Sequence, residues 1–188
     1  MADEKKNYKD TLNLPTTGFD MRAGLLTKEP AMQAEWKRND LYGRLRKSRK
    51  GAERFILHDG PPYANGNIHI GHTLNKVLKD MVVRVKNMTG FDAPYIPGWD
   101  CHGLPIEQKV MDELGPKARE MSAMDIRKRC WAYAETFCKL QGEQFERLGV
   151  MGEFERPYIT MDPAYESRVL DVFAKLIERK LVFRQLKP

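Results

Sequence analysis

The sequence has 188 residues, of which 41% are hydrophobic and 10% aromatic, and its formal net charge is +6. This length holds one ordinary domain or part of a larger one, and the composition argues against disorder. The positive balance fits an anionic partner such as a nucleotide or a nucleic acid. Charged residues of both signs make up 31% of the chain, however, and such a mixture also describes an ordinary solvated surface.

Targeting signals and cysteine usage predict the compartment. No apolar run is long enough to predict a membrane span, and residues 1–7 lack the apolar stretch of a signal peptide. Cys101, Cys130 and Cys138 are an odd and unclustered set, which favours reduced thiols over a disulfide framework. We therefore expect a cytoplasmic protein without a membrane partner.

The first fifty residues are predicted to be a polar lead-in followed by a helix. Residues 1–28 indicate an extended segment, and residues 29–50 a helix with Thr27 as a possible cap. The helix ends in a basic run over 44–50, whose cations complement the helix dipole; contact with RNA is the alternative interpretation. The buried candidates on this helix are Trp36, Leu41 and Leu45.

A strand, a helix and a second extended segment are predicted next. The apolar run 55–57 ends at turn residues and predicts a buried strand. Apolar residues at helical spacing predict a helix over 71–88, and Gly90 is placed to end it. Segment 91–97 is predicted to be extended, with its prolines confining it to a sheet edge or a strand end. This βαβ order predicts an α/β fold with a parallel sheet and a right-handed crossover.

Helices dominate the remainder of the prediction. Leu104–Leu114 is predicted to be a short helix, and Ser122 to begin a longer helix that Gly149 ends. Asp162 followed by proline predicts a further helix start, and 181–183 a possible strand. The predicted apolar face of that last helix is Val169, Val172, Phe173, Leu176 and Ile177. A single βαβ unit leaves a sheet edge open, which indicates part of a larger domain.

All four histidines fall between residues 58 and 102, in the same window as the βαβ unit. In open parallel sheets ligands bind at the carboxyl ends of strands, and residues 58–72 occupy that position. The helix start near Gly71 offers free N–H groups and a positive dipole end, which favour a phosphate. His69 and His72 can both point at one anion there and stabilise charge that develops on a phosphoryl group. Neither common phosphate-loop motif, G-x-x-x-x-G-K-[ST] or G-x-G-x-x-G, occurs in the sequence.

Other interpretations of these residues remain open. His69 and His72 also fit helix-capping or surface positions, or zinc ligands together with His58 or Cys101. The absence of a C-x-x-C pair or an H-E-x-x-H motif in the sequence counts against zinc. Asp100 also fits a helix cap, a role that is compatible with binding an ammonium group.

Residues 69–72, His-Ile-Gly-His, are identical to the HIGH signature of class I aminoacyl-tRNA synthetases. The longer stretches 58–72 and 98–107 resemble the isoleucyl enzymes of that class, and Met21-Arg22 and residues 158–165 are similar to them as well. The resemblance covers nearly the whole chain and is carried by specific motifs. It implies the first half of a class I synthetase Rossmann-like parallel sheet with flanking helices.

The resemblance also implies a domain division and an ATP site. Residues 1–50 would form a lead-in and helix, and 51–188 the first part of the catalytic domain, ending near the start of the editing insertion. By matching position, His69 and His72 would be catalytic, contacting the ATP phosphates, and Gly71 would leave room for the adenine. Mg²⁺ would accompany ATP, and no zinc is expected in this segment.

The amino-acid site implied by the resemblance consists of Gly60, Pro61 and Asp100, and the Asp100 carboxylate would hold the α-ammonium of isoleucine. The parent protein would convert isoleucine and ATP to isoleucyl-adenylate and pyrophosphate, then transfer isoleucine to its tRNA. The second family signature, KMSKS, does not occur in the sequence, so this chain alone is expected to be weak or inactive. The alternative is a synthetase-derived nucleotide-binding or regulatory module without charging activity.

Overall fold

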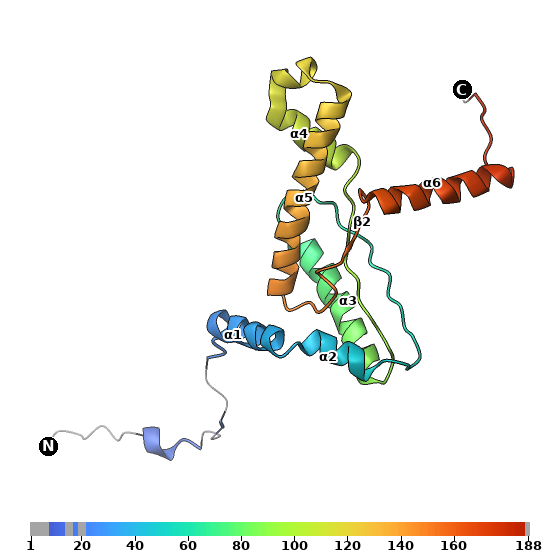
Figure 1. Ribbon diagram of the computed structural model, residues 1–188. Helices are drawn as coiled ribbons and strands as arrows, with labels where there is room; N and C mark the ends of the chain where they lie inside the picture. The colour runs from blue at the N-terminus through green and yellow to red at the C-terminus, as the bar shows by residue number, and fades with distance from the viewer. Residues whose placement is uncertain (1–7, 14–16, 19–21, 187–188) are drawn as a thin grey trace.

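The computed structural model describes residues 8–13, 17–18 and 22–186 of the chain (Figure 1). Helices form most of its regular structure. Met21, one of the residues that carry the resemblance, lies outside the described residues. In chain order the elements are η1 (Lys9–Thr11), α1 (Leu25–Arg38), α2 (Leu41–Ser48), α3 (Ile70–Met88), β1 (Gly98–Trp99), α4 (Leu104–Leu114), η2 (Gly115–Glu120), α5 (Ala123–Arg147), β2 (Tyr158–Ile159) and α6 (Pro163–Glu178).

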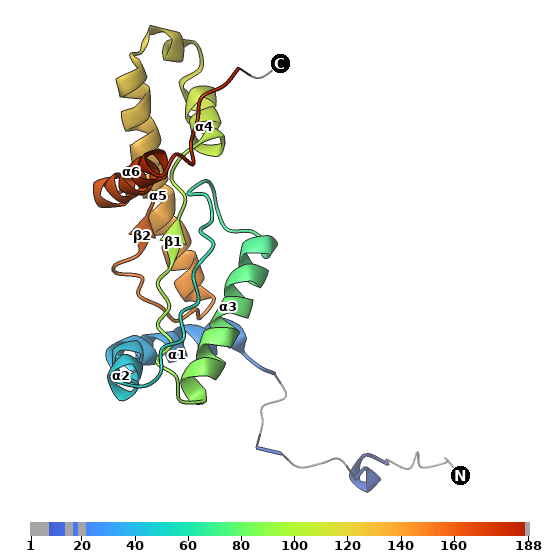
Figure 2. The same ribbon diagram turned by 90° about the vertical axis from the view of Figure 1, so that its right-hand side faces the viewer.

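Three extended segments lie parallel to one another, with residues 91–100 in the middle. On one side β1 pairs in parallel with β2, and on the other side two isolated parallel bridges join residues 91–100 to residues 53–64. Both ribbon views show these segments running alongside α3 and α5 (Figures 1 and 2). The paired residues are Gly98 with Tyr158, Trp99 with Ile159, Arg54 with Asp92, and Tyr63 with Asp100. The predicted parallel α/β arrangement is therefore present in reduced form.

The prediction of a strand over 55–57 is wrong, because these residues form no regular strand. Between residues 22 and 186 the sheet has two strands, and residues 53–55 contribute a single bridge, in which the Phe55 N–H donates to the Asp92 carbonyl (3.0 Å). Pro94 and Pro97 interrupt the middle segment, and a proline has no N–H to donate to a ladder. Parallel pairing is consequently limited to short stretches before Pro94 and after Pro97.

The predicted helices after residue 70 are confirmed. The helix α3 ends at Met88, and Gly90 follows it with a positive φ of 105°, the conformation that glycine adopts most readily. The start of α5 is capped by Ser122, whose hydroxyl accepts the Asp125 N–H (3.1 Å). The start of α6 is capped by Asp162, whose carboxylate accepts the Ala164 N–H (2.7 Å). The possible strand at 181–183 does not form.

The single helix predicted over 29–50 is also wrong, because the structure has two helices there. The chain breaks at Asp40, which adopts a left-handed conformation with φ of 46° and accepts the Gly43 N–H on its carboxylate (3.2 Å). The first helix, α1, begins at Leu25, two residues before the expected cap. Thr27 instead donates its hydroxyl to the Gly24 carbonyl (3.0 Å), inside the first turn.

The main core lies between α4, α5 and the extended segments. Its central contact is the Trp99 indole, which packs near the Phe145 ring and donates its N–H to Gln141 of α5 (3.0 Å). Gln141 in turn donates to the Tyr63 and Gly66 carbonyls, so α5 holds the loop that leads into α3. The buried members of this core are Ala64, Trp99, Cys101, Ile106, Val110, Ala134, Cys138, Phe145 and Met161.

Two helices expose their apolar faces. On α3 the buried residues are Lys76, Val83 and Asn87, a mostly polar set. The apolar residues that predicted the helix are all exposed, namely Leu74, Leu78, Met81, Val85 and Met88. The helix α6 extends away from the rest of the chain and buries none of its residues, so its predicted apolar face is exposed as well (Figure 1).

Candidate functional site

The site is built around the first turn of α3, where two imidazoles cap the helix reciprocally. His69 is the N-cap residue, with an extended backbone, and its Nδ1 accepts the Gly71 N–H (3.1 Å). The Nδ1 of His72 accepts the His69 N–H (3.2 Å). This is the geometry of a capping box with imidazoles in place of the usual hydroxyl and carboxylate. The two ring centroids lie 4.0 Å apart, so the structure brings these predicted residues together.

The capping bonds determine which ring nitrogens remain available. An Nδ1 that accepts an N–H carries no proton, so the neutral ring holds its proton on Nε2 and can donate it. His69 is exposed and His72 half-buried, so an anion at the helix start is within reach of such donors. The sequence predicted free backbone N–H groups at this turn. In the structure the His69 and Gly71 N–H groups are occupied by the imidazoles, which present their own donors instead.

The electrostatics of the turn keep His72 uncharged near neutral pH. Desolvation lowers the pKa of the His72 imidazole, and the neighbouring His69 and Lys76 lower it further. Gly71 contributes through its size, because a Cβ added there would lie 2.9 Å from the His69 ring. The expectation that this glycine leaves room for an adenine is thus joined by a second reason for its identity: it permits the capping position of the His69 ring.

A cavity of about 200 Å³ lies between the start of α3 and the loop that follows residue 59. Its lining residues are Gly60, Pro62, Gly71, His72, Asn75 and Lys76. Pro61 is half-buried in the same loop, between two of the lining residues. The structure therefore brings Gly60, Gly71 and His72 to a single cavity.

Asp100 lies beside this loop, at the end of the middle segment. Its N–H donates to the Pro62 carbonyl (2.8 Å), and its carbonyl accepts the Ala64 N–H (2.9 Å). Oδ1 of its carboxylate accepts from the His102 N–H (3.3 Å) and the Thr160 hydroxyl (3.5 Å). No residue in the described part of the chain donates to Oδ2, which leaves that oxygen available to a cation.

Of the alternative roles considered for these residues, helix capping by His69 and His72 is confirmed, and the others find little support. The N-cap of α4 is Gly103, so Asp100 does not cap that helix. The two extra ligands proposed for zinc are engaged elsewhere: His58 stacks on Tyr158 with centroids 5.6 Å apart, and the Cys101 Sγ lies 3.6 Å from the Cys138 Sγ. Among residues 22–186 no group of three or more histidine, cysteine or acidic side chains is arranged to hold a metal.

A buried charge cluster next to the cavity was not predicted from the sequence. The Asp59 side chain is 0% exposed and forms ion pairs with Lys76, itself 2% exposed, and with Lys79 (2.6 Å). Burial alone would raise the pKa of the Asp59 carboxyl, but the two lysines and the Gly98 N–H hold it below its ordinary value. Desolvation lowers the pKa of Lys76 despite this partner. A lysine four residues after His72, on the same helix face, was the available signal.

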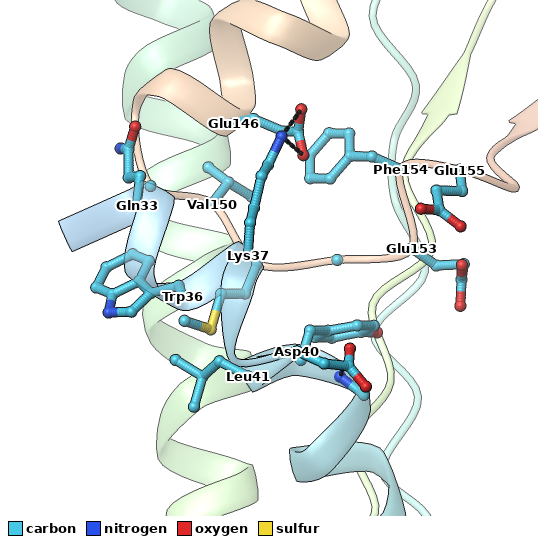
Figure 3. A pocket seen from close by; sticks show the side chains of 15 residues that line it. Gln33, Trp36, Lys37, Asp40, Leu41, Glu146, Val150, Glu153, Phe154 and Glu155 are labelled. Atoms are coloured by element: carbon cyan, nitrogen blue, oxygen red, sulfur yellow. Dashed lines mark hydrogen bonds and ion pairs between the residues drawn. The ribbon is translucent and has the colours of Figure 1, made fainter. Parts of the chain in front are cut away.

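Two of the further cavities border the helices α1, α2, α4 and α5. One of about 550 Å³ separates α1 and α2 from the segment after α5, and contains none of the predicted site residues (Figure 3). In that view Lys37 reaches across it to Glu146 (3.2 Å), with Trp36 and Val150 among the apolar residues of its wall (Figure 3). The other, of about 680 Å³, is lined in part by Cys101 and His102, which directly follow Asp100 in the chain. The histidines at the start of α3 and the cavity beside them therefore remain the candidate site, because they offer hydrogen-bond donors to an anion.

Comparison with known proteins shows the family of the chain. The family model for tRNA synthetases class I (I, L, M and V) matches residues 31–188. Isoleucine–tRNA ligase of Kosmotoga olearia is 58% identical over 182 residues, which cover 97% of this chain and 20% of that protein. Isoleucine–tRNA ligase of Thermotoga maritima is 56% identical over 181 residues, which cover 96% of this chain and 20% of that protein. The chain thus spans about a fifth of the length of these curated relatives.

A solved structure shows the same fold. The LeuRS of Agrobacterium radiobacter K84, in a ternary complex with tRNA and LeuAMS, superposes with a TM-score of 0.67 at 19% identity. The match covers 87% of this chain and 19% of that one. No helix in the described residues is both long and apolar enough to cross a membrane. By its sequence match, its fold and its HIGH motif, the chain belongs to the class I tRNA synthetases of the isoleucine, leucine, methionine and valine group.

Proposed function

We propose that this chain is the first part of the catalytic domain of an isoleucine–tRNA ligase, and that the longer protein joins isoleucine to its tRNA in two steps. In the first step isoleucine and ATP give isoleucyl-adenylate and pyrophosphate, and in the second the amino acid passes to the tRNA. The observation that carries the proposal is the reciprocal imidazole cap of His69 and His72, within a chain 58% identical to an isoleucine–tRNA ligase. Residues 1–50 precede the catalytic domain, which begins at residue 51.

In this proposal the ATP phosphates lie at the start of α3. The Nε2–H groups of His69 and His72 donate to phosphate oxygens, and the positive end of the helix dipole favours the same charge. The cavity beside Gly71 and His72 adjoins this position. Mg²⁺ enters on the phosphates as part of the substrate and neutralises them. A neutral imidazole suits this role, because it donates without requiring a proton from solvent.

The amino acid lies at Asp100 in the same proposal. Oδ2 of the carboxylate accepts the α-ammonium of isoleucine, while the Thr160 hydroxyl and the His102 N–H hold Oδ1 in place. Gly60 and Pro61 line the side of the substrate nearest the loop. The ammonium contact directs the isoleucine carboxylate towards the α-phosphorus of ATP.

The adenylation step then requires no covalent enzyme intermediate. A carboxylate oxygen of isoleucine forms a bond to the α-phosphorus, and the bond from that phosphorus to the bridging oxygen breaks. The electron pair leaves with pyrophosphate, on which the imidazole donors stabilise the developing charge. This chain contributes positioning and electrostatics to the step. Alone it is expected to be weak or inactive, since it spans about a fifth of its relatives.

The test is ATP–pyrophosphate exchange dependent on added amino acid, measured for the chain alone and for a full-length ligase that contains it. We expect exchange with isoleucine in the full-length protein, a smaller signal with valine, and little or no exchange with the chain alone. Exchange that favours leucine or methionine would contradict the substrate assignment. ATP binding by the full-length protein without exchange would favour a nucleotide-binding or regulatory module instead.

A further inference from the structure

Asp59 connects four parts of the site through one buried residue. Its carboxylate forms ion pairs with two lysines of α3, Lys76 and Lys79 (2.6 Å to Lys79). The same carboxylate accepts the Gly98 N–H of β1 (3.0 Å). Its own backbone carbonyl accepts the hydroxyl of Tyr158 at the start of β2. The next residue in the chain is Gly60, so the carboxylate is attached directly to the loop that lines the cavity.

These contacts determine how far the two walls of the cavity lie from each other. Gly60 and Pro62 form one wall, and α3, through His72 and Lys76, forms the other. Lys76 both lines the cavity and pairs with Asp59, and Lys79 also donates to the Gly60 carbonyl (3.3 Å). In the described part of the chain, the hydrogen bonds and ion pairs between side chains of α3 and residues 59 and 60 all come from these two lysines.

Lys76 is part of α3 and has other buried partners, so its ion pair with Asp59 fixes the position of the helix relative to Asp59. Its ammonium donates to the Tyr95 hydroxyl (3.0 Å) and lies 5.0 Å from the centre of the Phe145 ring. His72 precedes it by one helical turn on the same face. A shift of the buried ion pair would therefore move the imidazole relative to the loop.

We propose that Asp59 is a positioning residue for adenylation: its buried ion pairs with Lys76 and Lys79 fix the distance between the Gly60 loop and the His72 face of α3. The inference rests on the proposed function of the site. Asp59 touches neither reacting group, and acts by holding the amino-acid side of the site in register with the phosphate side.

The experiment measures isoleucine-dependent ATP–pyrophosphate exchange in a full-length ligase containing this segment, with kcat and KM determined separately and corrected for the folded fraction. Asp59→Asn keeps the shape of the side chain and removes its charge. We expect kcat to fall about 100-fold while the KM for isoleucine changes less than about threefold, because small misplacements of reacting groups have effects of that size. A purely structural role would lower the folded fraction and leave the corrected kcat unchanged.

The matched control is Asp80→Asn, which removes a carboxylate that lies on α3 itself. Asp80 pairs with Arg84 (2.5 Å) and accepts the Met151 N–H (2.9 Å), away from the cavity. It should lower stability and leave kcat within about twofold, since it positions no group of the site. Should Asp59→Asn fail to fold, Lys79→Gln tests the same link more gently, and a kcat loss of about tenfold is expected.

The outcomes separate the two claims. If the unaltered ligase exchanges but the folded Asp59→Asn and Lys79→Gln variants retain its kcat, the positioning role is overturned and the proposed function stands. If the unaltered ligase shows no isoleucine-dependent exchange, the proposed function is overturned, and this inference with it.

Discussion

The imidazoles of His69 and His72 lie with their centroids 4.0 Å apart, and each accepts a backbone N–H from the turn that the other helps to cap. Two positive charges at this separation would repel each other, and the adjacent helix end is already positive. The pair is therefore suited to donate hydrogen bonds in its neutral form. This one relationship links the local fold of α3 to the chemistry proposed for it.

The first prediction concerns the titration of His72. Its pKa should lie below the ordinary histidine value of about 6.5, because desolvation, His69 and Lys76 all disfavour the imidazolium. Below about pH 6.5 the unfolded chain then binds a proton that the folded chain does not, so stability should fall as the pH drops through that range. Above about pH 6.5 both states are neutral and His72 contributes no pH dependence.

Proton NMR of the histidine Cε1–H resonances measures this pKa, with His72→Gln used to assign the signal. A His72 resonance that titrates at or above the ordinary value would show that the surroundings of the ring do not disfavour the imidazolium. That result would contradict the neutral-donor account.

The second prediction concerns Gly71→Ala. The added Cβ would lie 2.9 Å from the His69 ring, so the ring must leave its capping position. Adenylation by the full-length ligase should fall by about 10- to 100-fold, the size of effect expected when a catalytic donor is displaced. Gly142→Ala is the matched control, since its Cβ would make ordinary contact with Trp99 at 3.7 Å and it lies inside α5. It should leave activity unchanged and stabilise the protein by about 0.5–1 kcal/mol.

The third prediction concerns the close contact between β1 and β2. A Cβ on Gly98 would lie 2.0 Å from the Tyr158 ring, which stacks with His58 and with Tyr165. Gly98→Ala should therefore destabilise the chain by about 1–3 kcal/mol or more, as overpacking does in a filled core. Chemical denaturation followed by circular dichroism measures the change. An unaltered midpoint would mean that the two segments do not pair in solution.

The fourth prediction concerns the exposed apolar face of α3, which includes Leu78 and Val85. Contiguous exposed apolar surface binds other apolar groups, so the chain alone should bind a hydrophobic dye and associate at high concentration. Leu78→Lys should reduce both effects with little loss of stability, because that side chain is 53% exposed. Equal dye binding by the variant would show that the dye binds another exposed apolar surface, and α6 is the next candidate.

Helix positions were predictable, but which face they bury was not. Periodicity and turn residues give α3, α4, α5 and α6 close to their observed bounds. The apolar stripe of α3 is nevertheless exposed, because the inward positions carry Lys76 and Asn87, whose side chains bond to Asp59 and Arg46 in other segments. A pattern counts apolar residues along the chain and contains no information about a carboxylate seventeen residues away.

Backbone conformation accounts for the other differences. The break between α1 and α2 depends on the left-handed Asp40, and the strand expected at 55–57 is reduced to a bridge by prolines in its partner segment. At the site, the HIGH motif and its flanking stretches predict His69, Gly71, His72, Gly60, Pro61 and Asp100. The Asp59 cluster is not evident from the sequence, because its members look like ordinary surface charges there and their burial is what distinguishes them.

The measurement that tests the central claim most directly is isoleucine-dependent ATP–pyrophosphate exchange by the full-length ligase carrying His69→Ala/His72→Ala or Asp100→Ala. The histidine variant should lose about 100-fold or more in kcat, since it removes both phosphate donors. Asp100→Ala should instead raise the KM for isoleucine by about 10-fold or more, because it removes the ammonium contact. Unchanged exchange in either variant would contradict the account, since the group removed could then have no part in adenylation.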